Sequence, residues 1–264
     1  MTGAQIKAAA DALYQALRER APIEPLTQTY PDIDLPQAYA ISQALLERRL
    51  GDGERLVGKK IGVTSRAVQD LLDVRQPDFG FLTDVMEVDG VVDLSGGLIQ
   101  PRAEGEIAFR LGADLMGPGI TPEQVLAATE RVYPCFEIVD SRVRDWKIRI
   151  QDTVADNASS GVFVLGRGVS PRDLDLSNCT MNVSKNGQPL SEGRGVTSLT
   201  GSPALGSPEN CIAWLANTLS AFGVRLKAGE IILSGSLVPL EPVGRGDHMA
   251  LTIEGMGGVQ VRFR

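Results

Sequence analysis

The segment 103–111 constrains the fold more than any other stretch of this sequence, because two kinds of residue alternate along it. Ile107 and Phe109 stand two positions apart, which predicts a β-strand with one face in a hydrophobic core. Glu104 and Glu106 recur on the opposite face, so the strand would direct two carboxylates into one small volume. Like charges this close repel each other, and burying them without a partner is costly. The segment therefore predicts a sheet with either a divalent-cation site or a solvated polar face on this side.

A third carboxylate supports the metal interpretation. Glu137 lies in the otherwise apolar segment 132–139 and needs a partner. It could complete a metal site with the paired glutamates, or it could form a salt bridge with Arg142 or Arg144. Ligands that are all oxygen atoms favour a hard cation such as Mg²⁺ or Mn²⁺ over zinc.

A lysine between two glycines is the next candidate for chemistry. Lys60 lies in the predicted strand 55–63, where Gly58 and Gly62 are its neighbours on the same face. These bare positions would leave space beside the ammonium group for a ligand. Lys59 must face the opposite way, so only one lysine of the pair could point inward. The alternative is two solvated lysines on an edge strand.

Two loops and one histidine complete the polar candidates. The segment 76–80 (QPDFG) reads as a rigid turn that could present Asp78 to a site. The segment 152–161 is rich in small polar residues and could bring N–H groups and hydroxyls to a substrate carboxylate, or it could be a simple connection. His248 is the single histidine, which excludes zinc sites built on several histidines; we expect it on a surface turn.

Composition limits the class of protein. The net charge of −7 argues against partners with an anionic surface, so we expect neither nucleic-acid nor membrane binding. No window is apolar enough to cross a bilayer, and residues 1–20 do not resemble a signal peptide. Three cysteines far apart in the sequence are typical of a reducing compartment, so we expect a cytoplasmic protein.

The periodicity along the chain predicts an α+β fold with a β-rich core. Helices are expected at 2–20, 36–50, 121–131 and 208–222. Strands are expected at 55–63, 81–94, 103–111, 132–140, 161–166, 179–186, 230–235 and 249–263. We therefore divide the chain into a small helical N-terminal part, residues 1–54, and a β-rich catalytic core, residues 55–264.

Several of these segments together resemble one known family. The chain is similar to the 2-oxopent-4-enoate (2-hydroxypenta-2,4-dienoate) hydratases of meta-cleavage pathways and to the related 4-oxalocrotonate decarboxylases. Both belong to the fumarylacetoacetate hydrolase superfamily. The similar motifs occur in order at 58–64, 76–80, 100–108, 154–159 and 231–235. One departure is Gly105, where the family pattern has alanine; we expect it to loosen the strand slightly.

The resemblance implies a fold and a set of site residues. The fold would be a mixed-sheet roll of the fumarylacetoacetate hydrolase C-terminal type around one site, in a homo-oligomer. A Mg²⁺ or Mn²⁺ ion would be held by Glu104, Glu106 and Glu137. The catalytic residues would be Lys60, Asp78 and Glu106. The substrate-binding residues would be Ile61, Asp156, Ser159, Ser160 and Ser236.

The implied reaction is the metal-dependent addition of water to a 2-hydroxydienoate, which gives a 4-hydroxy-2-oxoacid. The carboxylate and the C2 oxygen of such a substrate can chelate one metal ion, and Lys60 beside that cation would have a lowered pKa and shuttle protons. The hydrolase branch of the superfamily needs a histidine dyad, and no histidine precedes His248.

Two alternatives stay open. The first is decarboxylation of 4-oxalocrotonate, although that branch lacks the pattern at 144–146 and 152–153 found here. The second is a non-catalytic partner subunit, against which the intact set of three glutamates and Lys60 argues. Association with a pathway decarboxylase or aldolase is a further expectation.

Overall fold

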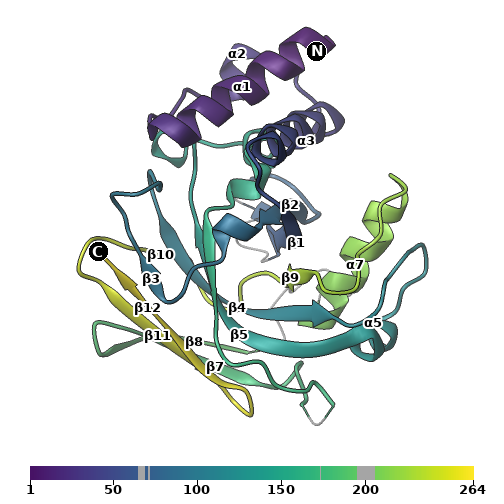
Figure 1. Cartoon of the computed structure of the whole chain (residues 1–264), viewed down its shortest axis with the longest axis vertical. Helices are drawn as coiled ribbons and strands as arrows, with labels where there is room; N and C mark the ends of the chain where they lie inside the picture. Colours follow the sequence, from purple (N-terminus) through teal and green to yellow (C-terminus); the bar gives the residue numbers. More distant parts are fainter. Residues whose placement is uncertain (65–68, 71, 173, 195–205) are drawn as a thin grey trace.

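The computed structural model describes residues 1–64, 69–70, 72–172, 174–194 and 206–264, and Figure 1 shows how its elements are arranged. The helices in this part of the chain are α1 (Gly3–Glu19), α2 (Leu26–Thr29), α3 (Leu35–Gly51), α5 (Pro122–Ala128), α6 (Ile150–Ala155) and α7 (Pro208–Ser220). The short 3-10 turns are η1 (Asp84–Met86), η2 (Arg144–Trp146) and η3 (Asn157–Ser159). The strands are β1 (Leu56–Gly62), β2 (Asp78–Thr83), β3 (Val91–Val92), β4 (Arg102–Leu111), β5 (Thr129–Val139), β6 (Val162–Leu165), β7 (Thr180–Lys185), β8 (Gln188–Arg194), β9 (Ile231–Leu233), β10 (Glu241–Pro242), β11 (His248–Ile253) and β12 (Gly257–Phe263).

Helices α1, α2 and α3 lie together at one end of the molecule (Figure 1). Helix α1 begins with a capping box, in which the side chains of Thr2 and Gln5 each accept a hydrogen bond from the other's backbone N–H. The apolar faces of these helices share one buried cluster with Val154 of α6. Because that cluster includes a helix from beyond residue 54, the division into parts 1–54 and 55–264 stays a prediction.

Two sheets form most of the rest of the described fold. The first has the strand order β2-β1-β9-β4-β5-β6, with β10 paired to the first two residues of β4. The second has the order β3-β12-β11-β7-β8. Strands β4 and β5 pair antiparallel over almost their whole length, so they form the longest ladder of the first sheet. The predicted α+β fold with mixed sheets is confirmed.

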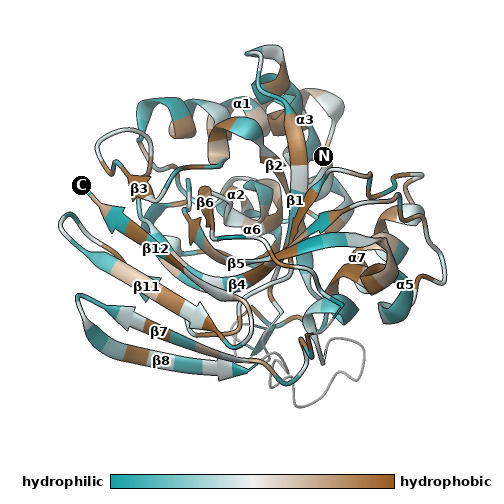
Figure 2. Cartoon of the chain, turned by 60° about the horizontal axis from the view of Figure 1, so that its bottom comes forward, coloured by the Kyte–Doolittle hydropathy of each residue, from teal (hydrophilic) through white to brown (hydrophobic). Residues whose placement is uncertain are grey.

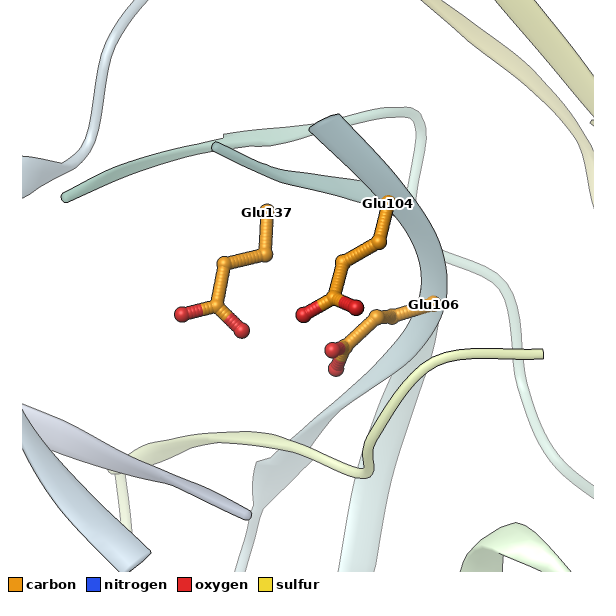
Figure 3. A group of neighbouring side chains, drawn as sticks. All are labelled: Glu104, Glu106 and Glu137. Atoms are coloured by element: carbon orange, nitrogen blue, oxygen red, sulfur yellow. The ribbon is translucent and has the colours of Figure 1, made fainter. Parts of the chain in front are cut away.

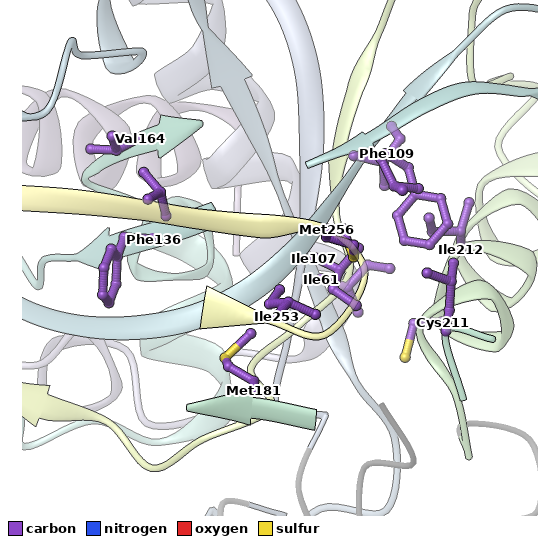
Figure 4. Packing of buried hydrophobic residues seen from close by; sticks show 14 of the residues in the cluster. Ile61, Ile107, Phe109, Phe136, Val164, Met181, Cys211, Ile212, Ile253 and Met256 are labelled. Carbon is purple, nitrogen blue, oxygen red and sulfur yellow. The ribbon is translucent and has the colours of Figure 1, made fainter. Parts of the chain in front are cut away.

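The main core lies where the two sheets face each other. Ile107 of β4 and Phe136 of β5 pack against Met181 of β7 and Ile253 of β11 in one buried cluster (Figure 4). Hydrophobic and hydrophilic residues both occur along β4, β5 and β7, whereas β8 is largely hydrophilic (Figure 2). Because side chains alternate along β4, the residues next to Ile107 point to the opposite face of the first sheet, where the candidate site lies.

Gly105 lies on the core face of β4, and its role differs from the predicted loosening of the strand. A Cβ atom at this position would lie 2.6 Å from Met181 Sδ and 3.2 Å from Leu251 Cδ2. The glycine therefore lets the second sheet pack closely against β4.

The predicted strand 81–94 is wrong in its bounds, because β2 begins at Asp78 and ends at Thr83. The side chain of Asp84 ends the strand, since its Oδ1 accepts hydrogen bonds from the backbone N–H groups of Arg55 and Val85. The chain then forms the turn η1 and pairs again only at the short strand β3.

Other bounds also differ from the sequence analysis. The predicted helix 121–131 ends at Ala128, because the residues that follow pair with β4 as part of β5. The predicted strand 249–263 is the hairpin of β11 and β12. Strand β8 and helix α6 were not predicted, since one is polar and largely exposed and the other is six residues long and almost wholly buried. Within the described residues, no helix combines the length and the apolarity that crossing a bilayer requires.

Candidate active site

Three glutamates converge on the face of the first sheet that points away from the core. Glu104 of β4 lies directly opposite Glu137 of β5 in the antiparallel register, so both side chains project from the same face. Glu106 lies two residues further along β4. One carboxylate oxygen from each residue lies within 4.8 Å of the other two, and Figure 3 shows the three groups pointing toward one another. Glu106 and Glu137 are fully buried, whereas Glu104 is partly exposed to a cavity.

Burial and mutual repulsion disfavour the charged forms of these carboxylates. Burial, reinforced by the charge of Glu137, raises the pKa of Glu104 to about 7 and raises the pKa of Glu106 well above its usual range. The backbone N–H of Gly235 donates a hydrogen bond of 2.9 Å to Glu106 Oε2. Glu106 Oε1 has no hydrogen-bond donor among the described residues. Such a group of buried acceptors needs a cation.

Lys60 supplies one positive charge to the cluster. Its Nζ lies 3.1 Å from Glu137 Oε1 and donates a hydrogen bond of 3.0 Å to the carbonyl oxygen of Ala158. Burial alone would lower the pKa of Lys60, but the charges of the surrounding carboxylates outweigh it and raise the pKa. The predicted lowering concerns Lys60 beside a bound cation, and it stays a prediction.

We expected the glycines beside Lys60 to leave space for a ligand. Gly62 does line a cavity together with Lys60, but other groups of the protein lie against both glycines. A Cβ atom on Gly58 would collide with the carbonyl oxygen of Ile231 in β9. A Cβ atom on Gly62 would collide with Oδ1 of Asp78. The two glycines thus admit a neighbouring backbone and a fourth carboxylate to the strand that carries Lys60.

Lys59 contradicts the expectation that only one lysine of the pair is buried. Both side chains are almost completely inaccessible to solvent. Lys59 points to the other face of the sheet, where its Nζ donates hydrogen bonds of 2.8 and 2.7 Å to the two carboxylate oxygens of Glu230. Burial lowers the pKa of Lys59, and the charge of Glu230 opposes this effect.

Asp78 is the first residue of β2 and not part of the predicted turn. It pairs with Gly62 of β1, and its carboxylate lies close enough to Lys60 for the two charges to interact. Burial raises the pKa of Asp78 to about 6, and the charge of Glu137 adds to this effect while that of Lys60 opposes it.

The loop beside Lys60 has an unusual backbone. Asn157, Ala158 and Ser159 have φ angles of 55°, 52° and 52°, in the left-handed region that favours glycine. The Asn157 side chain holds this turn against β2, because its Nδ2 donates to the carbonyl oxygen of Phe81 and its Oδ1 accepts from the N–H of Phe81. The turn directs the Ala158 carbonyl oxygen toward Lys60.

A cavity of about 430 Å³ opens beside the carboxylates. Of the residues predicted to bind substrate, it is lined by Ile61, Ser159 and Ser236. Asp156 and Ser160 do not line it. Asp156 is fully buried in an ion pair with Arg142, and the Ser160 hydroxyl donates to the carbonyl oxygen of Asn157.

The alternative partners considered for Glu137 are engaged elsewhere. Arg142 pairs with Asp156, and Arg144 pairs with Glu24 at a distance of 2.7 Å. The salt bridge of Glu137 is with Lys60 instead. His248 begins β11, and its ring Nε2 lies 3.3 Å from Gln260 Oε1. The histidine does not line the cavity.

The sequence analysis did not identify the apolar wall of the cavity. This wall is contributed by residues from several separate segments, among them Val63, Leu72, Trp146, Ile148 and Leu240. No spacing relates these residues, because only the tertiary fold brings their loops together. The sequence analysis includes the segment 144–146 in a family pattern but does not predict that it lines a cavity.

The fold and the site define the class of protein. Residues 73–264 match the model of the fumarylacetoacetate (FAA) hydrolase C-terminal family. The chain belongs to this family.

Two relatives narrow the family further. The chain is 57% identical over 255 residues to a 2-hydroxyhexa-2,4-dienoate hydratase from Comamonas testosteroni, covering 95% of this chain and 94% of the relative. It is 61% identical over 217 residues to a 2-hydroxypent-2,4-dienoate hydratase from Pseudomonas putida, covering 81% of this chain and 95% of that relative. Within the FAA hydrolase fold, the chain therefore belongs to the family of the 2-hydroxydienoate hydratases.

A solved structure shows the same fold. The 4-oxalocrotonate decarboxylase from Pseudomonas putida G7, complexed with magnesium and adipate, superimposes with a TM-score of 0.94 at 34% sequence identity. The match covers 100% of this chain and 99% of the decarboxylase. The resemblance proposed from the sequence motifs, to hydratases and decarboxylases of this superfamily, is confirmed.

Proposed function

We propose that this chain is a metal-dependent hydratase that converts 2-hydroxypenta-2,4-dienoate, or a substituted analogue, into a 4-hydroxy-2-oxoacid. The observation that carries the proposal is the convergence of Glu104, Glu106 and Glu137 beside Lys60 at one end of a cavity. The relatives named as 2-hydroxydienoate hydratases support the choice of substrate.

A divalent cation fits the three glutamates. Their donor atoms are all carboxylate oxygens, which favour Mg²⁺ or Mn²⁺. Glu106 Oε1 and Glu137 Oε2 are buried without a hydrogen-bond donor among the described residues, so a cation would satisfy groups that the protein leaves open. When bound, the cation supplies Lewis acidity toward the C2 oxygen and the carboxylate of the substrate.

The side chains around this site would move the protons of the reaction. The dienol first becomes the conjugated 2-oxo-3-enoate, which requires removal of the proton from the C2 hydroxyl and addition of a proton at C5. Water then adds at C4, with a proton to C3. Lys60 is held as an ammonium group by its carboxylate neighbours, so it is the candidate proton donor.

Asp78 is the candidate proton acceptor. Its pKa is raised to about 6, so near neutrality it is charged but close to its titration range. It lines the cavity together with Lys60 and Glu104, and it can therefore reach a water molecule or the C5 position of a bound dienoate. Glu106 would serve as a second acceptor if its contact with the cation exchanges. Ile61, Ser159 and Ser236 would contact the substrate.

Decarboxylation of 4-oxalocrotonate is the second candidate function, because the solved decarboxylase shares the fold over the whole chain. The purified protein with Mg²⁺ is incubated with 2-hydroxypenta-2,4-dienoate and, separately, with 4-oxalocrotonate. Loss of the dienol absorbance with formation of 4-hydroxy-2-oxovalerate supports the hydratase. Release of CO₂ from 4-oxalocrotonate supports the decarboxylase, and inactivity toward both supports a non-catalytic partner subunit.

The role of the cation has its own test. Glu104→Gln keeps the shape of the side chain but removes one negative charge from the site. We expect it to weaken Mg²⁺ or Mn²⁺ binding by at least about tenfold, with a parallel loss of hydration activity. Calorimetry measures the metal affinity, and a chelator gives the activity without the cation. Unchanged activity in the presence of the chelator would remove the cation from the mechanism.

We also propose a cytoplasmic homo-oligomer, which could associate with a pathway decarboxylase or aldolase. Large apolar side chains such as Val85, Val91 and Phe222 are exposed on the isolated chain, and a second copy could cover some of them. Light scattering of the purified protein measures the mass in solution, and a mass near 28.2 kDa would contradict the oligomer.

A further inference from the structure

The distal part of the cavity is apolar. Away from the carboxylates, its wall is formed by side chains such as Leu72, Ile148, Pro239 and Leu240. Among the described residues that line the cavity, Lys60 is the only cation, and it is bound to Glu137. A second carboxylate at the distal end of a ligand would therefore lose its hydration without gaining a cationic partner among the described residues, which is costly.

Trp146 holds a fixed place in this wall. Its backbone has a φ angle of 55°, which is unfavourable for a residue of this size. The indole Nε1 donates a hydrogen bond of 3.0 Å to the carbonyl oxygen of Gln100. The side chain of Gln100 also accepts a hydrogen bond from the N–H of Asp145, at 2.7 Å. The hydrogen bond of the indole and that of the neighbouring Asp145 N–H, both to Gln100, therefore hold this strained turn in position.

A second cation lies against Trp146 but does not reach the cavity. The guanidinium carbon of Arg102 lies 4.7 Å from the centre of the Trp146 ring, a cation–π contact. Trp146 lines the cavity, whereas Arg102 does not. No carboxylate of the described residues lies within 4.0 Å of the Arg102 guanidinium, so its charge is not neutralised by an ion pair.

The position of Arg102 along β4 determines how far its side chain lies from the glutamates. Arg102 begins β4 two residues before Glu104, so both side chains project from the same face. A strand rises by about 3.4 Å per residue, which places Arg102 roughly 7 Å from Glu104 along β4. This separation is comparable with the length of an extended six-carbon diacid. A diacid whose 2-oxocarboxylate end lay at the glutamates would bring its other end near Arg102.

We propose that Trp146 determines the substrate class by covering Arg102. With the indole in place, the distal wall accepts an apolar tail and disfavours a second carboxylate. Without the indole, the guanidinium would be open to the cavity and could bind a distal carboxylate through two hydrogen bonds. The inference rests on the proposed function, because it assumes that the 2-oxocarboxylate end of the substrate lies at the glutamates.

The test compares two ligands that differ only at their distal end, 2-oxohexanoate and 2-oxoadipate. Calorimetry in the presence of Mg²⁺ gives their affinities for the full-length protein and for four variants: Trp146→Ala, Trp146→Phe, Arg102→Met and the double variant Trp146→Ala/Arg102→Met. We expect the unchanged protein to prefer 2-oxohexanoate. Trp146→Ala should shift the affinity ratio toward 2-oxoadipate by at least about tenfold, which corresponds to about 1.4 kcal/mol.

The other variants separate the proposed cause from a general loosening of the cavity. Trp146→Phe keeps an aromatic ring over the guanidinium and should retain the preference for 2-oxohexanoate. The double variant should lose the shift that Trp146→Ala produces. A shift of equal size in the double variant, or no shift in a folded Trp146→Ala protein, would overturn the proposal.

Arg102→Met keeps the test valid even if Trp146→Ala does not fold. Because the indole already covers Arg102, this variant should leave the affinity ratio unchanged. Weaker binding of 2-oxoadipate alone would mean that Arg102 reaches the cavity in the unchanged protein, which would contradict the proposal. These affinities do not depend on turnover, so a protein inactive toward the dienoate would disprove the proposed hydration and still give a clear ratio.

Discussion

Lys59 and Lys60 are neighbours on one strand, and both are buried, yet their surroundings differ completely. Among the described residues Lys59 has a single hydrogen-bond partner, since both of its hydrogen bonds reach the carboxylate of Glu230. Lys60 interacts with the charges of four carboxylates, those of Glu137, Glu104, Asp78 and Glu106. One face of the sheet thus holds a balanced ion pair, and the other holds an excess of negative charge. A balanced pair stabilises a fold, whereas an unbalanced cluster is typical of a site that binds and reacts.

The largest effect that could test the contrast between Lys59 and Lys60 is a change in kcat. We expect Lys60→Met to lower kcat for hydration by about 10² to 10⁴, because the site loses its proton donor. The variant should still fold, which circular dichroism and thermal unfolding can check. Steady-state kinetics with the dienoate measures the loss. Full activity in a folded Lys60→Met protein would show that both lysines are structural.

The matched substitution on the other face should act on stability instead. Lys59→Met leaves Glu230 buried without its cation, which costs about 3 kcal/mol of unfolding free energy. The double variant Lys59→Met/Glu230→Gln should recover much of this loss, because no unpaired charge remains. Denaturant unfolding measures both, while the kcat of the folded protein should stay close to that of the parent. Equal unfolding free energies of the single and double variants would show that the charge of Glu230 does not depend on Lys59 as its partner.

A smaller loss of unfolding free energy is expected from a substitution on the core face of β4. Gly105→Ala would place a methyl group against Met181 and should lower the unfolding free energy by about 2 kcal/mol. Because the contact is with a flexible thioether, Met181→Val should lose less stability in the Gly105→Ala background than in the parent. A double-mutant cycle by denaturant unfolding measures this coupling. Additive effects would mean that the two sheets do not pack as closely as the structure describes.

The smallest expected effect is a pH dependence of stability in the metal-free protein. The pKa of Glu104 is raised to about 7, above its value in an unfolded chain. Between these values the folded protein binds more protons than the unfolded chain, so its stability falls as pH rises. We therefore expect a higher Tm at about pH 5.5 than at about pH 7.5, and a smaller difference in Glu104→Gln. An equal difference in both proteins would assign the dependence to other groups.

The sequence predicted the features of the site that depend on local spacing. The alternation along β4 placed Glu104 and Glu106 on one face, because a strand repeats every two residues. The convergence of Glu137 depends instead on the register between β4 and β5, which no local pattern specifies. The apolar segment around Glu137 predicted that it needs a partner but left open a metal ion or a salt bridge, and the resemblance to a family assigned it to the metal site.

Other features of the site depend on contacts between distant parts of the chain. The partner of Lys59 lies 171 positions away in the sequence, so a lysine expected to be solvated is in fact buried. The glycines beside Lys60 predicted open space at these two positions. Only the structure shows that Asp78 lies against Gly62 and that the backbone of β9 lies against Gly58. Likewise, the resemblance implied that Asp156 contacts the substrate. The path of the loop instead places its carboxylate in an ion pair with Arg142.

The left-handed turn at Asn157, Ala158 and Ser159 has an evolutionary consequence. Each of these residues occupies a conformation that costs an L-amino acid roughly 1 kcal/mol or more, and glycine would remove that cost. A glycine at position 158 would also free the turn to move, and with it the carbonyl oxygen that faces Lys60. A stabilising mutation is therefore available at position 158, where selection for turnover opposes it, whereas glycine at position 157 would lose the two hydrogen bonds to Phe81. At this turn, natural variation should reflect the needs of the reaction more than the stability of the fold.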